Sequence, residues 1–148
     1  MSKILYLQQN EKVAILSGAT GVTIQELKKM VPVGLPYVII NDDHLPCAEH
    51  LSNFFDALTA DFDSPGQPKV HIDLDKAKEI AKNRIRAARE KFFEKNDIVI
   101  RDAMLTANQV TINNAVKERN KLKDLTKIVD NIVDIDELLE KVIEIENQ

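Results

Sequence analysis

The chain has 148 residues, 44% hydrophobic and 30% charged, which is typical of a folded domain with a real core. Its single cysteine, Cys47, excludes an intramolecular disulfide and a multi-cysteine zinc site. The formal net charge of -4 argues against bulk binding to nucleic acid or anionic membranes, and no apolar run approaches the roughly 18 residues of a membrane span. We therefore expect no nucleic-acid partner, no membrane partner and a cytosolic location.

The two halves of the sequence differ in their Gly and Pro content and in their density of charged residues. All four glycines and all five prolines lie in residues 1–68, which carry 12 charged residues. Residues 69–148 contain no Gly or Pro and carry 32 charged residues. Because Pro and Gly interrupt regular structure, this division predicts an α+β fold class. We expect a small α+β module in residues 1–62, a linker in residues 63–69, and a helical, partly coiled-coil-like region in residues 70–148.

The N-terminal module begins with a predicted hairpin, because short apolar runs at residues 4–7 and 13–16 flank a polar stretch. The capping-box pattern Thr23-x-x-Glu26 then predicts a helix that ends before Pro32.

A third strand is expected at residues 37–40, and Pro46 suits the first position of a second helix. The apolar residues of this second helix follow at helical spacing: Leu51, Phe54, Phe55 and Leu58. The predicted order of the module is β-β-α-β-α.

The C-terminal region shows narrow apolar stripes at helical spacing. Asp73 is a plausible N-cap for a stripe formed by Leu74, Ala77, Ala81, Ile85, Ala88 and Phe92. Thr106-x-x-Gln109 is a second candidate cap, before a heptad-like seam at Ala115, Leu122, Leu125, Val129 and Ile132. Asp134-x-x-Glu137 precedes a last helix with the seam Ile135, Leu138, Val142 and Ile145.

Two arrangements would cover these stripes. The helices pack on the N-terminal sheet within one chain, or they self-associate or dock on a partner. Because the N-terminal module is small and has helices of its own to cover, we expect a homo-oligomer or an obligate protein partner. The residues expected to bind the partner are Lys78, Lys82, Arg86, Arg89, Leu122, Leu125, Leu138 and Val142.

The charges of the C-terminal region divide into a basic and an acidic segment. Residues 75–95 hold eight Lys/Arg against four Asp/Glu, and residues 130–148 hold seven Asp/Glu against Lys141 alone. The basic row, formed by the Lys and Arg residues of 75–95, has three interpretations. It is a solvated or internally paired face of its helix, or it binds an acidic surface of another protein, or it contacts nucleic acid. Pairing between the two segments, within or between chains, would weaken with salt.

Few residues form patterns that suit a metal site, a phosphate-binding loop or a catalytic site. His44, Cys47 and His50 form the one metal-like group, but their spacing does not place them on one face of a helix, so a polar helix entry is favoured over a metal site. The loop at residues 17–21 lacks the Lys and Ser/Thr that end a phosphate-binding loop. We therefore expect no enzyme activity, no metal and no cofactor.

Two motifs in order resemble a family of small tailed-bacteriophage proteins encoded among tail and tail-fibre genes. The first is Pro32-x-Gly34-x-Pro36-Tyr37, which leads into the strand and ends at Leu45-Pro46. The second is Asp73-Leu74-Asp75-Lys76-Ala77-Lys78, which opens the basic helix. The second motif is followed by Arg84-Ile85-Arg86-Ala87-Ala88-Arg89, Phe92 and Asp97, so the resemblance covers roughly residues 31–97.

The resemblance implies a tail-fibre assembly chaperone or a small structural component of the tail, found in the host cytoplasm during assembly or in the virion tail. It implies a phage tail or tail-fibre protein as partner and brings no catalytic residues. The alternative function is a phage-encoded protein that inhibits a host defence or metabolic enzyme, with the acidic surface of the last helix as a decoy.

Overall fold

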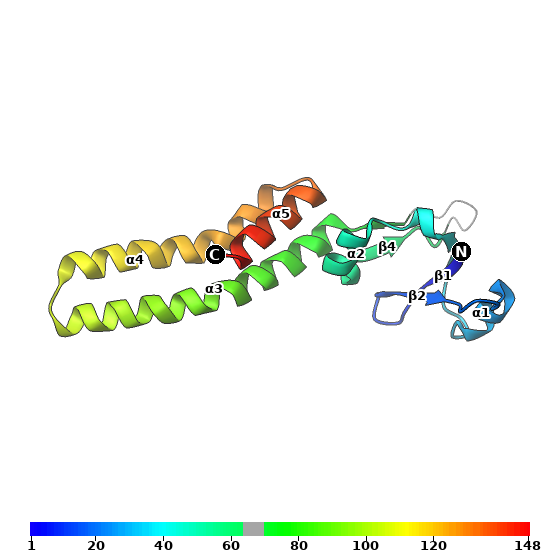
Figure 1. Ribbon diagram of the computed structural model, residues 1–148, viewed down its shortest axis with the longest axis horizontal. Coiled ribbons are helices and arrows are strands. Elements are labelled where there is room, and N and C mark those ends of the chain that lie inside the picture. The colour runs from blue at the N-terminus through cyan, green and yellow to red at the C-terminus, as the bar shows by residue number, and fades with distance from the viewer. Residues whose placement is uncertain (64–69) are drawn as a thin grey trace. The chain divides into compact units, whose positions relative to one another are not determined.

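The structure is a computed structural model that describes residues 1–63 and 70–148 (Figure 1). It has the predicted α+β fold class, with a small N-terminal sheet followed by a mostly helical C-terminal half. The chain divides into two compact units, Met1–Ala77 and Lys78–Gln148. Of the predicted linker, residues 63–69, only Asp63 is among the described residues.

The N-terminal unit contains the predicted elements in the predicted order. They are β1 (Ser2–Leu7), β2 (Val13–Ser17), α1 (Ile24–Met30), β3 (Tyr37–Asn41) and α2 (Ala48–Phe54). The three strands form one antiparallel sheet in the order β2-β1-β3. Leu5 lies opposite Ile15 on one side and Val38 on the other, so the central strand joins the hairpin to β3.

A second, two-stranded sheet was not predicted. It pairs β4 (Leu58–Ala60) with β5 (Val70–Ile72), both antiparallel and only three residues long. Leu58 therefore belongs to a strand and not to the second helix, which ends at Phe54 and is followed by a 3₁₀ turn, Phe55–Ala57. The helical region begins at Leu74, after this sheet, and not at residue 70.

The core of the N-terminal unit follows from the alternation of side chains along the strands. One buried cluster consists of Leu5, Val13, Val38, Ile40 and Leu58. Ile4 faces the opposite side of the sheet and is also buried, and the helix α1, which contacts β1, contributes buried Leu27. Both faces of the small sheet are therefore covered within the unit.

The start of α1 confirms the predicted capping box. The Thr23 hydroxyl accepts a hydrogen bond from the Glu26 amide, and the Glu26 carboxylate accepts one from the Thr23 amide at 2.7 Å. Pro46, by contrast, is not the first residue of α2, because Cys47 is the N-cap and the helix begins at Ala48. Pro46 thus precedes the cap and fixes the approach of the chain to the helix.

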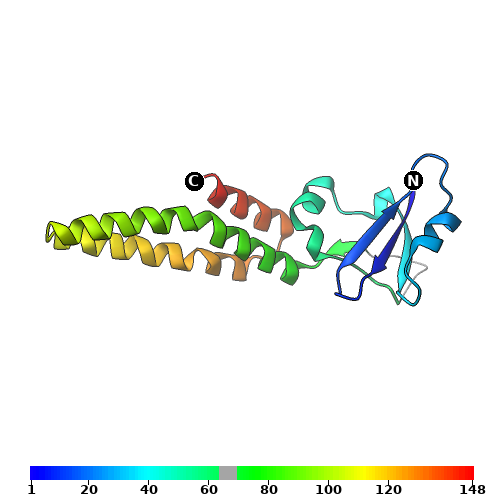
Figure 2. The ribbon, with the colours of Figure 1, turned by 90° about the horizontal axis from the view of Figure 1, so that it is seen from below.

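The C-terminal unit is built on a helical hairpin. It consists of α3 (Leu74–Leu105), which begins four residues before the unit, α4 (Gln109–Asp124), a 3₁₀ segment (Leu125–Asn131) and α5 (Ile135–Glu146). Figures 1 and 2 show α3 and α4 side by side and antiparallel, with α5 beside the part of the hairpin that lies away from the α3–α4 connection.

The apolar seams of the last two helical segments are covered inside this unit. In these segments Val129, Ile132, Leu138, Leu139, Val142 and Ile145 are buried, and in the first half of α3 Ala81 and Ile85 are buried as well. The expected continuous seam from Ala115 to Ile132 is wrong, because α4 ends at Asp124 and the 3₁₀ segment follows. This change of direction allows α5 to pack back onto the hairpin and to bury its own stripe.

The α3–α4 connection is a Schellman-type C-cap without glycine. The Asn108 amide donates to the Ala103 carbonyl at 2.9 Å, and the Ala107 amide donates to the Met104 carbonyl at 3.2 Å. Ala107 has a φ of 53°, the left-handed conformation usually taken by glycine. The predicted cap at Thr106 is wrong: its hydroxyl bonds back to α3, and Asn108 caps α4 by accepting from the Thr111 amide.

Replacing Ala107 with glycine is expected to raise the free energy of unfolding by about 1 kcal/mol, because glycine adopts this φ without the penalty on Cβ. The matched control is Ala103→Gly in the last turn of α3, which is expected to lower stability by roughly 1 kcal/mol. Urea unfolding followed by circular dichroism measures both changes. A loss of stability in Ala107→Gly would contradict the assigned cap.

Candidate protein-binding surfaces

The basic row that was expected to grip a partner mostly binds its own chain. The Lys78 ammonium donates to the Asp130 carbonyl at 3.0 Å, and the Lys82 ammonium pairs with the Asp130 carboxylate at 2.7 Å. The hydrogen bond from Lys82 lowers the pKa of Asp130. The Arg86 guanidinium donates to the side-chain oxygen of Asn83 at 2.7 Å, and Arg86 is exposed. Of this row, Arg86 is the member most available to another molecule.

Arg89 closes the C-terminal end of α4. Its guanidinium donates to the carbonyls of Leu122 and Lys123, both at 3.1 Å, which lie in the last turn of the helix. It also lies over the ring of Phe93, 5.4 Å from the centroid. The last carbonyls of a helix lack partners within the helix, so a cation there supplies hydrogen bonds and a favourable charge. Arg89 thus positions the turn toward α5.

Arg89→Ala is expected to destabilise the chain by about 1–2 kcal/mol, because charge-assisted hydrogen bonds to two carbonyls are lost at a partly buried site. Arg86→Ala, on the same helix, is the matched control and is expected to change stability by less than about 0.5 kcal/mol. Chemical denaturation of both variants measures the difference. Equal effects would show that Arg89 does not cap α4.

The basic and acidic segments meet within one chain through Arg84 and Glu146. The guanidinium donates two hydrogen bonds of 2.7 Å to the two carboxylate oxygens, in a bidentate pair that is about one third exposed or less. The hydrogen bonds from Arg84 lower the pKa of Glu146. The interpretation of the basic row as internally paired is therefore supported at this point, and the pair ties α5 to α3.

This pair predicts a pH dependence. A carboxyl whose pKa is lower in the folded chain contributes stability above its unfolded pKa, about 4.3 for Glu, and loses it as pH falls through the folded pKa. Glu146→Gln should therefore lose less stability than the wild type when unfolding is measured at pH 3 instead of pH 7. Because the pair is partly exposed, the difference should be about 1 kcal/mol or less. Glu140→Gln, at an exposed position of α5, should keep the wild-type pH profile.

The apolar residues of the expected partner site are covered inside the unit to different degrees. Leu138 and Val142 are fully buried, so they hold α5 in place and do not lie on the surface. Leu122 and Leu125 are half-buried. Leu138 and Val142 are thus buried by their own chain, whereas Leu122 and Leu125 stay partly exposed.

The exposed aliphatic side chains of this unit gather instead at the α3–α4 connection. We call residues 98–116 the charge-poor end, because only Arg101 and Asp102 are charged among its 19 residues. Six of its large apolar side chains are exposed: Ile98, Val99, Met104, Leu105, Val110 and Val116. Leu105, the most exposed, has 81% of its surface open to solvent. The low charge of this segment was the sequence signal that could have located the surface.

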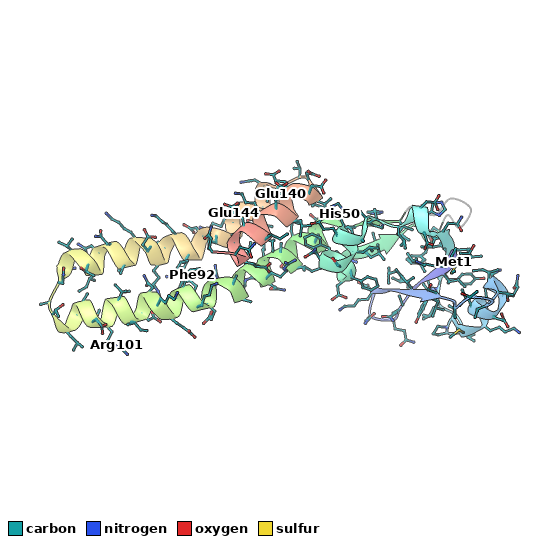
Figure 3. The ribbon with its side chains drawn as sticks, viewed as in Figure 1. Met1, His50, Phe92, Arg101, Glu140 and Glu144 are labelled. Atoms are coloured by element: carbon teal, nitrogen blue, oxygen red, sulfur yellow. The ribbon has the colours of Figure 1, made fainter. Side chains whose placement is uncertain are left out.

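Phe93 marks the inner border of the charge-poor end. The Arg119 guanidinium lies 5.1 Å from the centroid of its ring and pairs with Asp97 on α3. Asn96 is buried beside this pair, and its side-chain amide donates to the Ala115 carbonyl at 2.8 Å. These polar contacts tie the middle of α3 to α4. Figure 3 shows Phe92 and Arg101 on this part of α3.

The candidate metal residues are not brought together. Among the described residues, no group of three His, Cys, Asp or Glu is arranged to hold a metal ion. The Nδ1 atom of His44 accepts a hydrogen bond from the Asn41 amide at 3.0 Å, which occupies that nitrogen locally. Cys47 is exposed. In residues 1–63 and 70–148, no helix is long and apolar enough to span a bilayer.

An open groove of about 520 Å³ lies in the N-terminal unit, between the β1–β2 turn and the loop before β3. Its lining consists of Tyr6, Gln8, Gln9, Asn10, Pro32 and Leu35. These side chains can stack and form hydrogen bonds. They do not include a carboxylate, imidazole or thiol for acid–base or nucleophilic chemistry.

Comparisons with protein-family models, with curated proteins and with solved structures found no match for this chain.

Proposed function

We propose that this chain is a non-enzymatic bacteriophage tail accessory protein that acts by binding another protein. The observation that carries the proposal is the exposed apolar surface of the charge-poor end. Six large apolar side chains are exposed in this short segment, and exposed apolar surface is where proteins commonly bind other molecules. The resemblance of residues 31–97 to tail and tail-fibre accessory proteins supplies the class of partner, a phage tail or tail-fibre protein.

The proposed binding site differs from the one expected from the sequence. Lys78, Lys82 and Arg89 hold the 3₁₀ segment and the end of α4, so they act on the fold of the unit. The partner is instead received at the end of the hairpin, where Leu105 on α3 and Val110 on α4 are exposed. Interfaces of this kind are depleted in charge at their centre, as this segment is.

Capture of a tail protein tests the proposed function. The tagged chain is co-expressed with candidate phage tail and tail-fibre proteins, and the retained proteins are identified. We expect wild type to retain one of them and Leu105→Glu to lose at least about tenfold of the capture, since a charge is then buried at the interface. Val133→Glu is the matched control, because Val133 is 83% exposed in the same unit but lies outside the charge-poor end. Equal capture by all three proteins would contradict the proposed site.

Mass spectrometry of purified particles separates the two forms of this function. A tail component is found in fixed copy number in the virion tail, whereas an assembly chaperone stays in the host cytoplasm and is absent from finished particles.

A second candidate function, inhibition of a host enzyme, is favoured by the exposed carboxylates of α5. Glu137, Glu140 and Glu144 are exposed on this helix, and Figure 3 shows Glu140 and Glu144 on it. An acidic helix of this kind suits a basic groove on an enzyme. Recovery of a host enzyme by the wild type, lost in a Glu137→Gln/Glu140→Gln variant but kept in Leu105→Glu, would favour this function over the first.

A further inference from the structure

The outer edge of β3, in the N-terminal unit, presents backbone groups that the sheet does not use. In the strand order β2-β1-β3, β3 pairs with β1 on one side only. The Leu7 amide donates to the Pro36 carbonyl at 3.0 Å, so the carbonyl of residue 36 faces β1. Because backbone groups alternate in direction along an antiparallel strand, Val38 also faces β1, whereas Tyr37 and Ile39 direct their amides and carbonyls outward. Among the described residues, no backbone group pairs with this outer edge.

The outer edge of β3 also has exposed apolar side chains and no protecting feature. Tyr37 is 39% exposed and Ile39 is 38% exposed, and they lie on the same face of the sheet because they are two residues apart. The strand contains no charged residue and no proline, and its register with β1 has no bulge. Proteins usually protect an edge strand with lysine, proline, a bulge or a covering segment. An edge without these features is a site where another strand can add.

The opposite edge of the sheet, β2, differs in its side chains. Val13 is buried and the next three residues are half-buried, so Ser17 is the exposed residue of this strand. Lys12, just before β2, pairs at 3.1 Å with Asp56 in the 3₁₀ turn that follows α2. Of the two edges, β3 is therefore the one that offers apolar side chains to another molecule.

We propose that the outer edge of β3 binds an extended segment of another protein, which adds to the sheet as a fourth strand. The backbone of this segment pairs with the amides and carbonyls of Tyr37 and Ile39. The segment has apolar residues at alternate positions, and these lie beside the side chains of Tyr37 and Ile39, where β-branched and aromatic residues pair best. The proposal concerns the N-terminal unit and adds a second binding site to the one at the charge-poor end.

An extended polypeptide is the class of ligand that fits these backbone groups. A polypeptide in the β conformation directs a donor and an acceptor to the same side at every second residue, which is the spacing of the outward groups of Tyr37 and Ile39. The free edge is short, because the Asn41 amide already donates to His44 Nδ1 at 3.0 Å and Pro36 has no amide hydrogen.

The short edge favours a flexible segment over a second folded copy of this chain. Two copies paired through their β3 edges share only the backbone bonds of Tyr37 and Ile39. From the exposed fractions of these residues, each copy would bury on the order of 200 Å² there. That area is far below the roughly 1,200 Å² of a stable interface. A flexible segment is not limited to the edge, because it can continue along the loop before β3, where Val33 is fully exposed.

Nuclear magnetic resonance on the isotope-labelled full-length chain tests the proposal. The probe is a soluble synthetic peptide in which Val or Tyr alternates with Thr between terminal lysines. We expect saturable shifts centred on the amides of Tyr37 and Ile39, which should also become protected from exchange with solvent. Two matched peptides carry N-methyl groups on one or the other alternate set of residues. Methylation of the set that faces β3 should weaken binding at least about tenfold, and methylation of the other set should not.

Variants of the two edge strands locate the bound peptide. Ile39→Pro removes an outward amide and keeps the bonds to β1, whereas Ile39→Lys puts a charge beside the bound strand. Each should weaken binding at least about tenfold. Ser17→Pro, at an outward position of β2, is the matched control and should bind as the wild type does. Circular dichroism should show equal secondary structure in all variants.

The proposal would be overturned by a wild type that shows no saturable change at Tyr37 and Ile39, by equal binding of all three peptides, or by equal binding to the wild type and both Ile39 variants. Changes at these two amides that depend on protein concentration without peptide would assign the edge to a second copy and would overturn it as well. None of these results bears on capture of a tail protein through Leu105, so the two proposals fail separately.

Discussion

Replacing Phe54 with alanine is expected to lower the free energy of unfolding by about 3–5 kcal/mol, the usual effect of truncating a buried aromatic ring. Phe54 ends α2 and is fully buried, and it is the largest such side chain in the described residues. Its removal leaves a cavity in a small unit that has few other large side chains to fill it. Thermal and urea unfolding of the purified variant measure the loss.

The adjacent residue provides the matched control for Phe54. Phe55 is 42% exposed in the 3₁₀ turn after α2, so Phe55→Ala should cost about 1 kcal/mol or less. Equal destabilisation of the two variants would mean that Phe54 is not more deeply buried than Phe55.

The second large effect is expected at Leu138. Its side chain is fully buried on α5, and Leu138→Ala should destabilise the chain by about 2–5 kcal/mol. The size of this loss tests whether α5 packs on its own hairpin. Urea unfolding at low protein concentration measures it, because any contribution from self-association is then removed.

A neighbouring exposed position controls for the loss of apolar side-chain atoms alone. Val133 is exposed just before α5, so Val133→Ala should change stability by less than about 0.5 kcal/mol. A Leu138→Ala variant as stable as Val133→Ala would mean that α5 does not cover the hairpin, and the seams would again need a partner.

The sequence predicts the N-terminal elements well because their signals are local. A polar stretch between two apolar runs encodes the hairpin of β1 and β2, and Thr23 with Glu26 encodes the start of α1. The pairing of β4 with β5 was missed because three residues are too few to show a period. Their pairing joins Leu58 to Ile72, which are far apart in the sequence.

The end of α3 escaped prediction for a different reason. Helix C-caps are usually recognised by glycine, and here Ala107 adopts the left-handed conformation. Without that signal, Thr106 looked like the start of the next helix, whereas its hydroxyl belongs to the end of α3.

The candidate site was predicted only in part, because the periodicity of a stripe does not say which helix covers it. Leu138 and Val142 were expected to bind a partner, but both are fully buried within the chain. The pairing of basic and acidic segments was likewise recognised, and Arg84 with Glu146 forms one such pair internally. The exposed apolar residues, such as Leu105, lie in residues 98–116, which carry only two charged residues. Reasoning that looked for pairs of charged segments therefore did not consider this part of the chain.

Hydrogen exchange measured by mass spectrometry at low and high protein concentration tests whether α5 covers the apolar seams within one chain. We expect amides of residues 138–145 to be strongly protected, and equally so at both concentrations, because the side chains of this segment are buried by the same chain. Loss of their protection on dilution would show that a second chain, and not the hairpin of the same chain, covers α5.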